Sequence, residues 1–388
     1  MTKKTGVFSL AALLAILMFS CEDSGREPDI QSYCNKIGLD AEQPASVKYA
    51  KGFSILKYGE ITKVIIKNPS MPKQILSTYY LVGDRKLKDE FANEKKLIKV
   101  PLEKFAVFSQ TQLSSLIKMG QAQKIVGVSE ARYITDSAIR KKITDGSIVE
   151  LAGNGEFYVE TALRLKPELI FYSPYKTNES HPLATSNILM VPYLDFMETS
   201  PLGRAEWIKF SAVFFGGADY ADSVFREIES SYNSYKNLVK DISYKPSVFS
   251  DKYFAGQWYV PGGKSYIARL FDDAGSDYLW KSDSGVASFP LDYEVVFKKA
   301  AHADFWRIVG SYNDEASYDF IGSQNELYTH FDAFKNKHII WCDAKNTSYF
   351  EKSPLEPQIL LADLIYCFHP ELLPGYKPVY YKVLVARH

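Results

Sequence analysis

The chain lacks an excess charge of either sign, and its N-terminal apolar run is too short to cross a bilayer. The 388 residues include 46 Lys and Arg and 46 Asp and Glu, so the formal net charge is zero. Proteins that bind nucleic acid or anionic membrane surfaces carry an excess of basic side chains, so we expect neither partner through surface charge. The apolar run, residues 7–19, is shorter than a transmembrane helix requires.

Histidine is scarce and scattered. The chain has six histidines, none of them in an HExxH motif and no two of them closely paired. A receptor for free zinc or manganese needs clustered His and carboxylate ligands, which this spacing does not provide. We expect helix-end, loop or core positions for His181, His302, His330, His338, His369 and His388.

Cysteine is also scarce. Of four cysteines, Cys21 belongs to the N-terminal signal described below, which leaves Cys34, Cys342 and Cys367. An odd number gives no disulfide framework, although a bond between Cys342 and Cys367 stays open outside the cytoplasm. We expect ordinary buried cysteines.

Motifs for nucleotide binding and hydrolysis are incomplete. Residues 153–158 begin like a dinucleotide loop but have Tyr158 at the third glycine position, and residues 261–265 end like a phosphate loop but have Trp258 at its first glycine. Residues 127–131 resemble a hydrolase nucleophile elbow around Ser129, with Ala131 replacing the final glycine.

The N-terminus has the pattern of an export signal. Lys3 and Lys4 precede the apolar run, and Ser20 and Cys21 follow it. A small residue before cysteine resembles a bacterial lipoprotein signal, in which Cys21 becomes the lipidated first residue and acyl chains hold the protein to a membrane. A cleaved, soluble export is the alternative. Polar residues 22–45 are expected to form a tether.

The folded part is expected to contain two α/β lobes. Residues 48–100 hold alternating or short apolar runs, which predict strands separated by turns. Strands then alternate with helices: strands at 105–108, 124–128, 169–172 and 189–193, and helices at 111–119, from 159 and at 202–215. Such alternation is typical of parallel sheets with right-handed crossovers.

A single long helix is predicted between the lobes. Apolar residues fall on one helical face from Ala221 to Val239, without Gly or Pro. The predicted domains are an N-terminal lobe at 46–218, a linker helix at 219–244 and a C-terminal lobe at 245–388, with strands at 247–250, 305–309 and 338–341 and a helix at 357–369. The fold class is therefore α/β, with a rigid linker helix and a ligand cleft between lobes.

One arrangement occurs twice: a glutamate opens a short helix that leads into an apolar strand. Glu160 does so within residues 158–172, and Glu294 within residues 293–309. Helix starts attract carboxylates through their unpaired N–H groups, so each glutamate could simply be a first-turn residue. Recurrence in both halves favours a shared function.

The chain resembles the periplasmic binding proteins of the iron-siderophore and vitamin B12 ABC importers over roughly residues 95–385. The resemblance rests on residues 160–172 and on ETSPLGRAEWIKF at 198–210. Residues 258–263, 265–266, 273–275 and 278–279 look like the branch found in lipoproteins of Bacteroidetes.

The resemblance implies that Glu160 and Glu294, one on each lobe, dock onto arginines of an ABC permease. It also implies ligand contacts from loops after the strands, at Asn154, Glu156, Tyr175, Trp280 and Phe289. Hydroxamate binders of the family often carry arginine near the position of Asn154, so its absence disfavours a simple ferric hydroxamate.

Side-chain chemistry adds further ligand candidates. Aromatic faces suit a large, flat chelate, and the candidates are Tyr175, Trp258, Tyr259, Tyr266, Trp280 and Phe289, several of which could instead be core residues. Arg132 and Arg204 could neutralise an anionic chelate, or could be surface and capping side chains.

The expected protein is a lipid-anchored, monomeric, non-catalytic receptor without a cofactor, in the periplasm or at the cell surface. It would capture a metal chelate, first of all a ferric siderophore, for an ABC permease; a corrinoid (vitamin B12) or haem is the alternative ligand. Two other classes stay open: an exported hydrolase that uses Ser129, and a surface binding module without a permease, in which Glu160 and Glu294 would face different directions.

Overall fold

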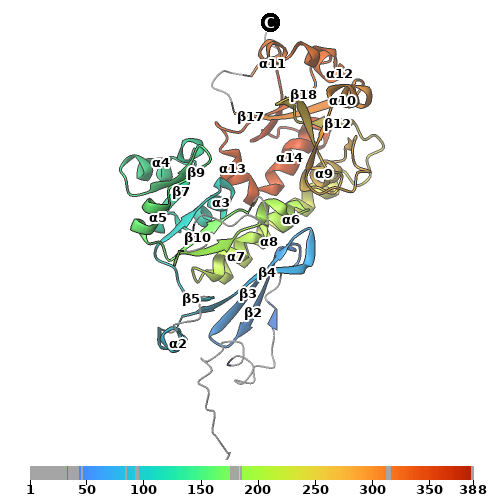
Figure 1. The fold of residues 1–388 in the computed structure, drawn as a ribbon. Coiled ribbons are helices and arrows are strands. Elements are labelled where there is room, and N and C mark those ends of the chain that lie inside the picture. Colours follow the sequence, from blue (N-terminus) through green and yellow to red (C-terminus); the bar gives the residue numbers. More distant parts are fainter. Residues whose placement is uncertain are drawn as a thin grey trace, which may run out of the picture. The chain divides into compact units, whose positions relative to one another are not determined.

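The computed structural model describes residues 47–83, 85–91, 96–174, 183, 186–311 and 316–385, together with Tyr33 and the backbone of residues 43–44. Residues 40–388 form one compact unit, which Figure 1 shows from the N-terminal strands in blue to helix α14 in red. The predicted lipidation site Cys21, Cys34, Tyr175 and most of the predicted tether, residues 22–45, lie outside the described residues. The end of the tether prediction is wrong, because residues 43–44 form strand β1, which pairs with β2.

The first sheet precedes the part of the chain that shows α/β alternation. It has the order β1-β2-β3-β4-β5 and is antiparallel except for the β4–β5 pair. Its inner face carries Ile55, Val64 and Ile66, all nearly inaccessible to solvent. The elements are β1 Gln43–Pro44, β2 Phe53–Tyr58, β3 Ile61–Asn68, β4 Met71–Val82, α2 Arg85–Glu90 and β5 Leu97–Lys99.

The second sheet carries the first strand and helix alternation. Its order is β11-β10-β6-β7-β8-β9, parallel except for the short hairpin strand β9. The predicted strands and helices of this region are confirmed, within one or two residues at their ends. The elements are β6 Phe105–Val107, α3 Gln110–Lys118, β7 Ile125–Ser129, α4 Ser137–Thr144, β8 Val149–Gly153, β9 Glu156–Phe157, α5 Val159–Leu165, β10 Leu169–Tyr172 and β11 Leu189–Pro192.

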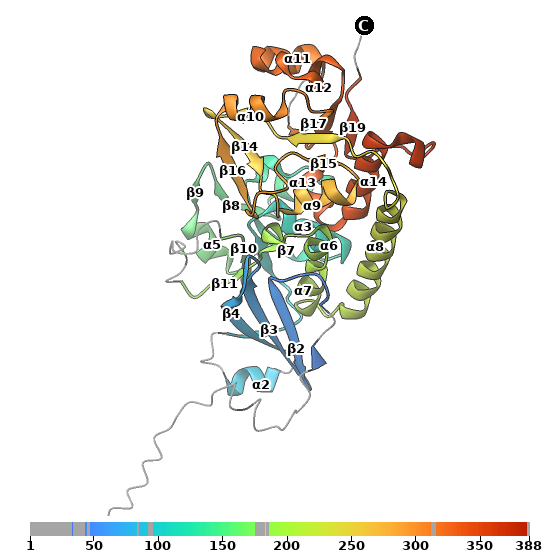
Figure 2. The same ribbon diagram turned by 90° about the vertical axis from the view of Figure 1, so that its right-hand side faces the viewer.

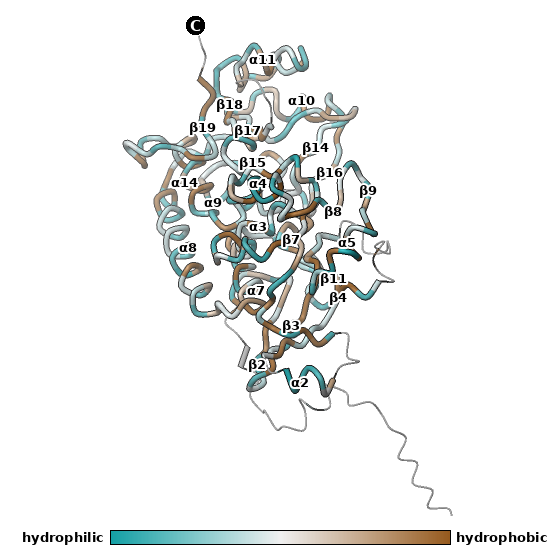
Figure 3. Tube along the Cα trace, turned by 90° about the vertical axis from the view of Figure 1, so that its left-hand side faces the viewer, coloured by the Kyte–Doolittle hydropathy of each residue, from teal (hydrophilic) through white to brown (hydrophobic). Residues whose placement is uncertain are grey.

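Three helices follow: α6 Pro201–Ala205, α7 Trp207–Val213 and α8 Ala218–Leu238. The predicted single helix at 202–215 is wrong, because the helix is interrupted at Glu206. The long helix is confirmed, and Figure 3 shows hydrophobic and hydrophilic residues alternating along it. It ends at Leu238, earlier than predicted, and Val239 and Ile242 pack against Gly275.

The third sheet has the order β15-β12-β17-β18-β19 and is parallel except for β19. The chain between β12 and β17 also forms a small antiparallel sheet with the order β13-β14-β16. The strands are β12 Ser247–Ser250, β13 Tyr253–Phe254, β14 Gln257–Pro261, β15 Asp277–Tyr278, β16 Ser288–Leu291, β17 Phe305–Gly310, β18 Ile339–Asp343 and β19 Tyr381–Val383. The helices are α9 Tyr266–Asp273, α10 Tyr293–Ala300, α11 Tyr318–Gln324, α12 Asp332–Lys335, α13 Tyr349–Lys352 and α14 Pro357–Phe368.

Aromatic side chains join the first sheet to the second. Phe53 of β2 packs edge-on against Trp207, with ring centroids 5.0 Å apart, and against Phe210 at 5.6 Å. These rings belong to one apolar core that also contains Phe105 and Phe171 of the second sheet. The first sheet is therefore continuous with the α/β part rather than a separate appendage.

Two buried carboxylates hold the backbone that leads into the first sheet. Glu206 accepts hydrogen bonds from the N–H groups of Tyr49 at 2.7 Å and Ala50 at 2.9 Å, and from Lys48 at 2.9 Å. Glu198 accepts from the N–H groups of residues 51 and 52 at 3.0 and 2.8 Å, and from the indole of residue 207 at 3.0 Å. We call residues 48–52 with these two glutamates the carboxylate clamp.

The clamp needs a glycine at its end. A Cβ atom on Gly52 would lie 2.6 Å from the ring of Trp207, which is closer than real contacts allow. The Trp207 indole also donates to Glu198, so the ring is fixed in the position that excludes a side chain there.

We predict that Glu206→Ala lowers the free energy of unfolding by about 3–5 kcal/mol, since three backbone N–H groups and the Lys209 ammonium lose a buried charged acceptor. Urea denaturation measures the loss, and hydrogen exchange should show faster exchange at the amides of residues 48–50. Glu227→Ala, on the exposed face of α8, is the matched control and should change stability by less than about 0.5 kcal/mol. Equal stability of the two variants would contradict the clamp.

Candidate functional site

The two duplicated glutamates occupy matching positions. Glu160 is the second residue of α5 and Glu294 the second residue of α10, and both side chains are exposed. Within the described part of the chain, neither carboxylate has an ion pair or a hydrogen bond. Both helices lie toward the left in Figure 2, whereas in Figure 1 α5 lies at the left and α10 at the upper right. Both glutamates are therefore available to a partner's cations.

Arg132 and Asn154 are in direct contact in the structure, and the sequence alone did not predict this contact. Arg132, in the one-turn helix after β7, donates from Nη1 to the Asn154 side-chain oxygen at 2.7 Å. Its guanidinium also pairs with Glu130 at 3.1 Å and lies over the ring of Tyr133, 4.6 Å from the centroid. An arginine from a neighbouring loop thus stands beside the position where hydroxamate binders often carry one.

This cluster is accessible. The Arg132 side chain is 54% exposed, and Asn154 and Glu156 are exposed as well. Glu130 and Asn154 both have positive φ, 47° and 55°, so each stands at a sharp turn after a strand. Loops of this kind at strand ends, next to a rigid sheet, are where ligand contacts are usually found.

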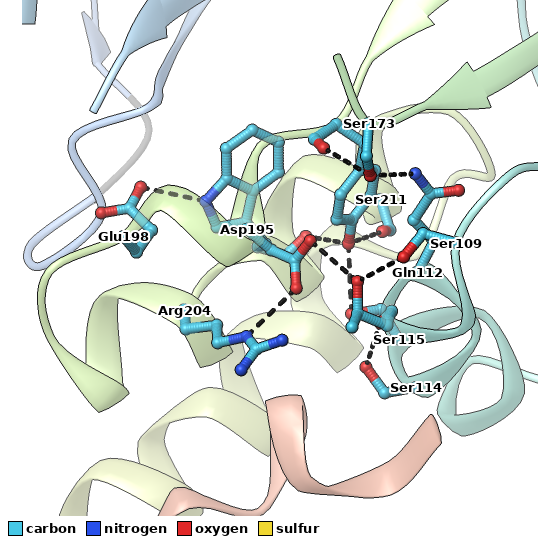
Figure 4. A network of polar contacts seen from close by, with 12 residues as sticks. Ser109, Gln112, Ser114, Ser115, Ser173, Asp195, Glu198, Arg204 and Ser211 are labelled. Carbon is cyan, nitrogen blue, oxygen red and sulfur yellow. Dashed lines mark hydrogen bonds and ion pairs between the residues drawn. The ribbon is translucent and has the colours of Figure 1, made fainter. Parts of the chain in front are cut away.

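Arg204 lies in a different environment. Its side chain is 10% exposed, and Nε pairs with Asp195 at 3.2 Å while the guanidinium lies 5.0 Å from the ring of Tyr266. Figure 4 shows Arg204 pointing at Asp195, which also accepts from Thr111 at 3.1 Å. Burial raises the pKa of Asp195, and Arg204 acts in the opposite direction. This arginine already has an internal counter-charge.

The aromatic residues predicted to contact the ligand differ in their exposure to solvent. Trp258 is fully buried, packs against both Phe249 and Trp306, and donates from its indole to a backbone oxygen at 2.9 Å, so its ring belongs to the core. Trp280 is 6% exposed, with the Lys299 ammonium 5.2 Å from its ring. Phe289 is half-buried opposite Val260, and Tyr259 on the other face is 42% exposed. Of these four rings, Tyr259 is the one a solute can reach directly.

Sequence reasoning missed a buried arginine in the C-terminal half. Arg307 of β17 is 5% exposed, and its guanidinium contacts Asp251 at 3.2 Å and the Tyr381 hydroxyl at 2.7 Å. Burial raises the pKa of Asp251, while Arg307 opposes that shift. The signal was present in the sequence, because an arginine inside the apolar strand FWRIVG requires a buried partner.

A second missed contact joins the halves of the fold. Glu351 of α13 is 1% exposed, and it accepts from the backbone N–H of Thr135 at 2.6 Å and also from the Thr135 hydroxyl. Thr135 follows Arg132 in the same loop, so this carboxylate fixes the loop that carries the exposed guanidinium. Nothing in the local sequence pattern connects positions so far apart.

Among the residues that the structure describes, no histidine makes a hydrogen bond with the Ser129 hydroxyl. That hydroxyl donates to the backbone oxygen of Phe108 at 2.9 Å. The described histidines have other contacts: His302 with Asp332, His330 with the ring of Phe297, His338 with a backbone oxygen at 3.2 Å, and His369 with a backbone oxygen at 3.0 Å. Groups of three or more metal-ligating side chains do not occur within the described ranges.

Both described cysteines are free and buried, so the Cys342–Cys367 disulfide does not form in this structure. Burial raises the pKa of the Cys342 thiol to about 12, which keeps it protonated and unreactive. Across the residues that the structure describes, no helix is long and apolar enough to cross a membrane.

The fold and these sites can now be compared with known proteins. The sequence model of the periplasmic binding protein family matches residues 106–346. The chain therefore belongs to the periplasmic binding protein family, whose members bind small molecules outside the cytoplasm for ABC importers.

Relatives and solved structures extend the comparison. Two uncharacterized lipoproteins of Methanocaldococcus jannaschii are similar to this chain. The first is 26% identical, over 85% of this chain and 83% of the relative. The second is 22% identical, over 87% of this chain and 86% of the relative. A periplasmic haem-binding protein from Pseudomonas aeruginosa is 14% identical, with a TM-score of 0.57 over 74% of this chain and 99% of its own. CeuE of Helicobacter pylori, in a Ni–His complex, is 14% identical, with a TM-score of 0.57 over 81% and 91%. At these identities the structures confirm the predicted fold class.

We predict that Arg204→Met lowers the free energy of unfolding by about 3–5 kcal/mol at neutral pH, because Asp195 is then a buried charge without a partner. The deficit should shrink as pH falls from neutral toward 3.8, the ordinary carboxyl value. The sign follows because removing Arg204 raises the folded-state pKa of Asp195 further, and protonation then removes the unpaired charge.

Urea denaturation at several pH values measures both effects. Arg204→Met combined with Asp195→Leu should recover part of the loss, since neither charge remains. Arg226→Met on the exposed face of α8 is the control for loss of one guanidinium. A pH-independent loss equal to that of the control would contradict the ion-pair account.

Proposed function

We propose that the protein is a lipid-anchored substrate-binding protein that captures an anionic metal chelate, first of all a ferric siderophore, and delivers it to an ABC permease. The observation that carries this proposal is the pair of exposed, unpartnered carboxylates, Glu160 and Glu294, at matching helix starts in the two halves. A binding protein that only stores its ligand has no need for such a pair.

Docking through these residues follows from ordinary electrostatics. An exposed carboxylate that meets an arginine forms short, often bidentate hydrogen bonds, and two such sites fix orientation as well as position. A permease that docks through both glutamates has to reach α5 and α10 together, whereas in a module without a permease the two glutamates are expected to face different directions.

The ligand contacts that we propose centre on Arg132, Asn154 and Glu156, with Tyr259 on the C-terminal half. Arg132 is exposed and held in place by Asn154 and Glu130, so its remaining N–H groups can receive chelate oxygens with little loss of conformational entropy. Arg204 and Arg307, by contrast, are buried and paired to Asp195 and Asp251. Tyr175 stays a predicted contact.

Haem or a corrinoid is the alternative ligand. Solved structures with this fold include proteins named as haem-binding, from Pseudomonas aeruginosa and from Roseiflexus, and one named as a possible iron-binding protein. A flat tetrapyrrole would stack on exposed aromatic rings, and Tyr133 and Tyr259 are 54% and 42% exposed. Two of the relatives from Methanocaldococcus jannaschii are named lipoproteins, which supports lipid attachment at Cys21.

We predict that Glu160→Lys combined with Glu294→Lys leaves chelate affinity within about twofold but lowers uptake by about a hundredfold or more, since each reversal replaces an attraction to arginine by repulsion. Uptake is measured with the cognate permease in proteoliposomes, and affinity on the same purified protein. The control carries Glu227→Lys and Glu60→Lys, two exposed glutamates on α8 and in the β2–β3 turn, and should transport normally.

Loss of affinity in the Glu160 and Glu294 variant would show that these residues contact the ligand and would remove the docking assignment. Normal uptake by that variant would also contradict it.

A further inference from the structure

A cavity of about 570 Å³ is lined by none of the residues assigned above to ligand or permease. Five stretches of the chain form its wall: Lys51 of the clamp, the β3–β4 turn and the start of β4 from Pro69 to Pro72, Thr199 before α6, Lys245 before β12, and residues of the C-terminal half from Gly263 to Val286. Figure 1 shows the blue β3–β4 hairpin reaching toward α9. The volume is in the range of small-molecule sites, which hold compounds in roughly 300–1,000 Å³.

The cavity wall has an excess of positive charge. Five cationic side chains line it, Lys51, Lys245, Lys264, Arg269 and Lys281, against the two carboxylates Asp272 and Asp277. In a concave site, such an imbalance concentrates the potential and attracts anions.

Ion pairs account for three of the five cations. Lys281 pairs with Asp277 at 2.5 Å, and Lys245 lies 4.0 Å from Asp272. Arg269 pairs at 3.3 Å with Asp273, which is not part of the wall. Lys51 and Lys264 have no carboxylate within ion-pair distance in the described part of the chain.

The ammonium of Lys51 makes a hydrogen bond but no ion pair within the described part of the chain. It donates to the hydroxyl of Thr199 at 3.4 Å. The buried carboxylate of Glu198 interacts with the Lys51 charge, but its oxygens accept from the backbone N–H groups of Lys51 and Gly52 and from the Trp207 indole. The Lys51 ammonium therefore has capacity for an incoming acceptor.

The opposite wall contains the loop that ends like a phosphate-binding motif in the sequence. Gly263, Lys264 and Ser265 line the cavity, and Ser265 caps α9 by accepting from the Ala268 N–H at 3.2 Å. A Cβ on Gly263 would lie 2.4 Å from the Asp283 oxygen, so the loop is closed tightly on itself and only glycine fits. The missing first glycine excludes a nucleotide loop, and the N–H groups of residues 263–265 already donate to the Asp283 carboxylate and to the backbone oxygens of residues 285 and 262. What this wall offers a phosphate group is therefore the ammonium of Lys264.

We propose that this cavity binds a phosphate group, held between Lys51 of the clamp segment and Lys264 before α9. The phosphate belongs either to a free small phosphate ester or to a phospholipid headgroup, since both present the same charged oxygens. Bound there, it would bridge the first sheet and the C-terminal half. The site shares no residue with the proposed chelate contacts or with the docking glutamates.

The test uses the chain without its signal and lipid, residues 22–388, and the variant Lys51→Gln/Lys264→Gln. Titration calorimetry with glycerol 3-phosphate and with inorganic phosphate tests the free source. Sedimentation with phosphatidylglycerol vesicles, against phosphatidylcholine vesicles, tests the headgroup. Lys57→Gln/Lys382→Gln, two exposed lysines outside the cavity, is the charge-matched control.

Saturable binding of a soluble phosphate or of phosphatidylglycerol vesicles is expected, weakened at least about tenfold in the cavity variant and unchanged in the control. Which arm responds identifies the source. Equal binding by the cavity variant and the control, or no binding in either arm, overturns the proposal. Thermal unfolding of all three proteins checks that each is folded, and chelate affinity should be the same in all three, so this proposal and the chelate function fail separately.

Discussion

The rest of the structure depends on two buried carboxylates whose charge is stabilised mainly by hydrogen bonds from backbone N–H groups rather than by cationic side chains. Glu198 and Glu206 face the backbone N–H groups of residues 48–52, so a peptide segment supplies most of the neutralising donors. That arrangement attaches the first sheet to α6 and α7, and it gives the stretch ETSPLGRAEWIKF a structural role. The same stretch places Arg204 against Asp195. Charge in this region is therefore used to hold segments together.

The buried and the exposed arginines differ in what they already contact. Arg204 and Arg307 are each nearly inaccessible and each meet an aspartate, so an incoming chelate would have to break an existing pair. Arg132 is half-exposed and braced by neighbours, while Glu351 fixes its loop through Thr135. An exposed guanidinium on a rigid loop combines access with low entropic cost, which is what capture of a soluble anion requires.

Sequence patterns predicted the elements better than the contacts. The strands at 105–108 and 247–250 and the long helix α8 follow from local periodicity, and the structure confirms them. The clamp pairs residues 146 to 158 positions apart, which no local pattern encodes. The sequence also did not show which aromatic candidates are buried and which are exposed. Trp258 and Tyr259 are neighbours in sequence, but they lie on opposite faces of β14, and only the packing of the whole fold determines which face is in the core.

The most direct test of the central claim is the equilibrium titration of the chain from residue 22 with ferric siderophores, haem and cobalamin, followed by tryptophan fluorescence. The tryptophans are buried, so quenching would report energy transfer to a coloured chelate rather than contact. The account predicts saturable quenching by one ligand at sub-micromolar concentration, weakened about tenfold by Arg132→Gln and unchanged by Arg226→Gln. No saturable quenching by any of the chelates, or equal affinity of the Arg132 variant, would contradict it.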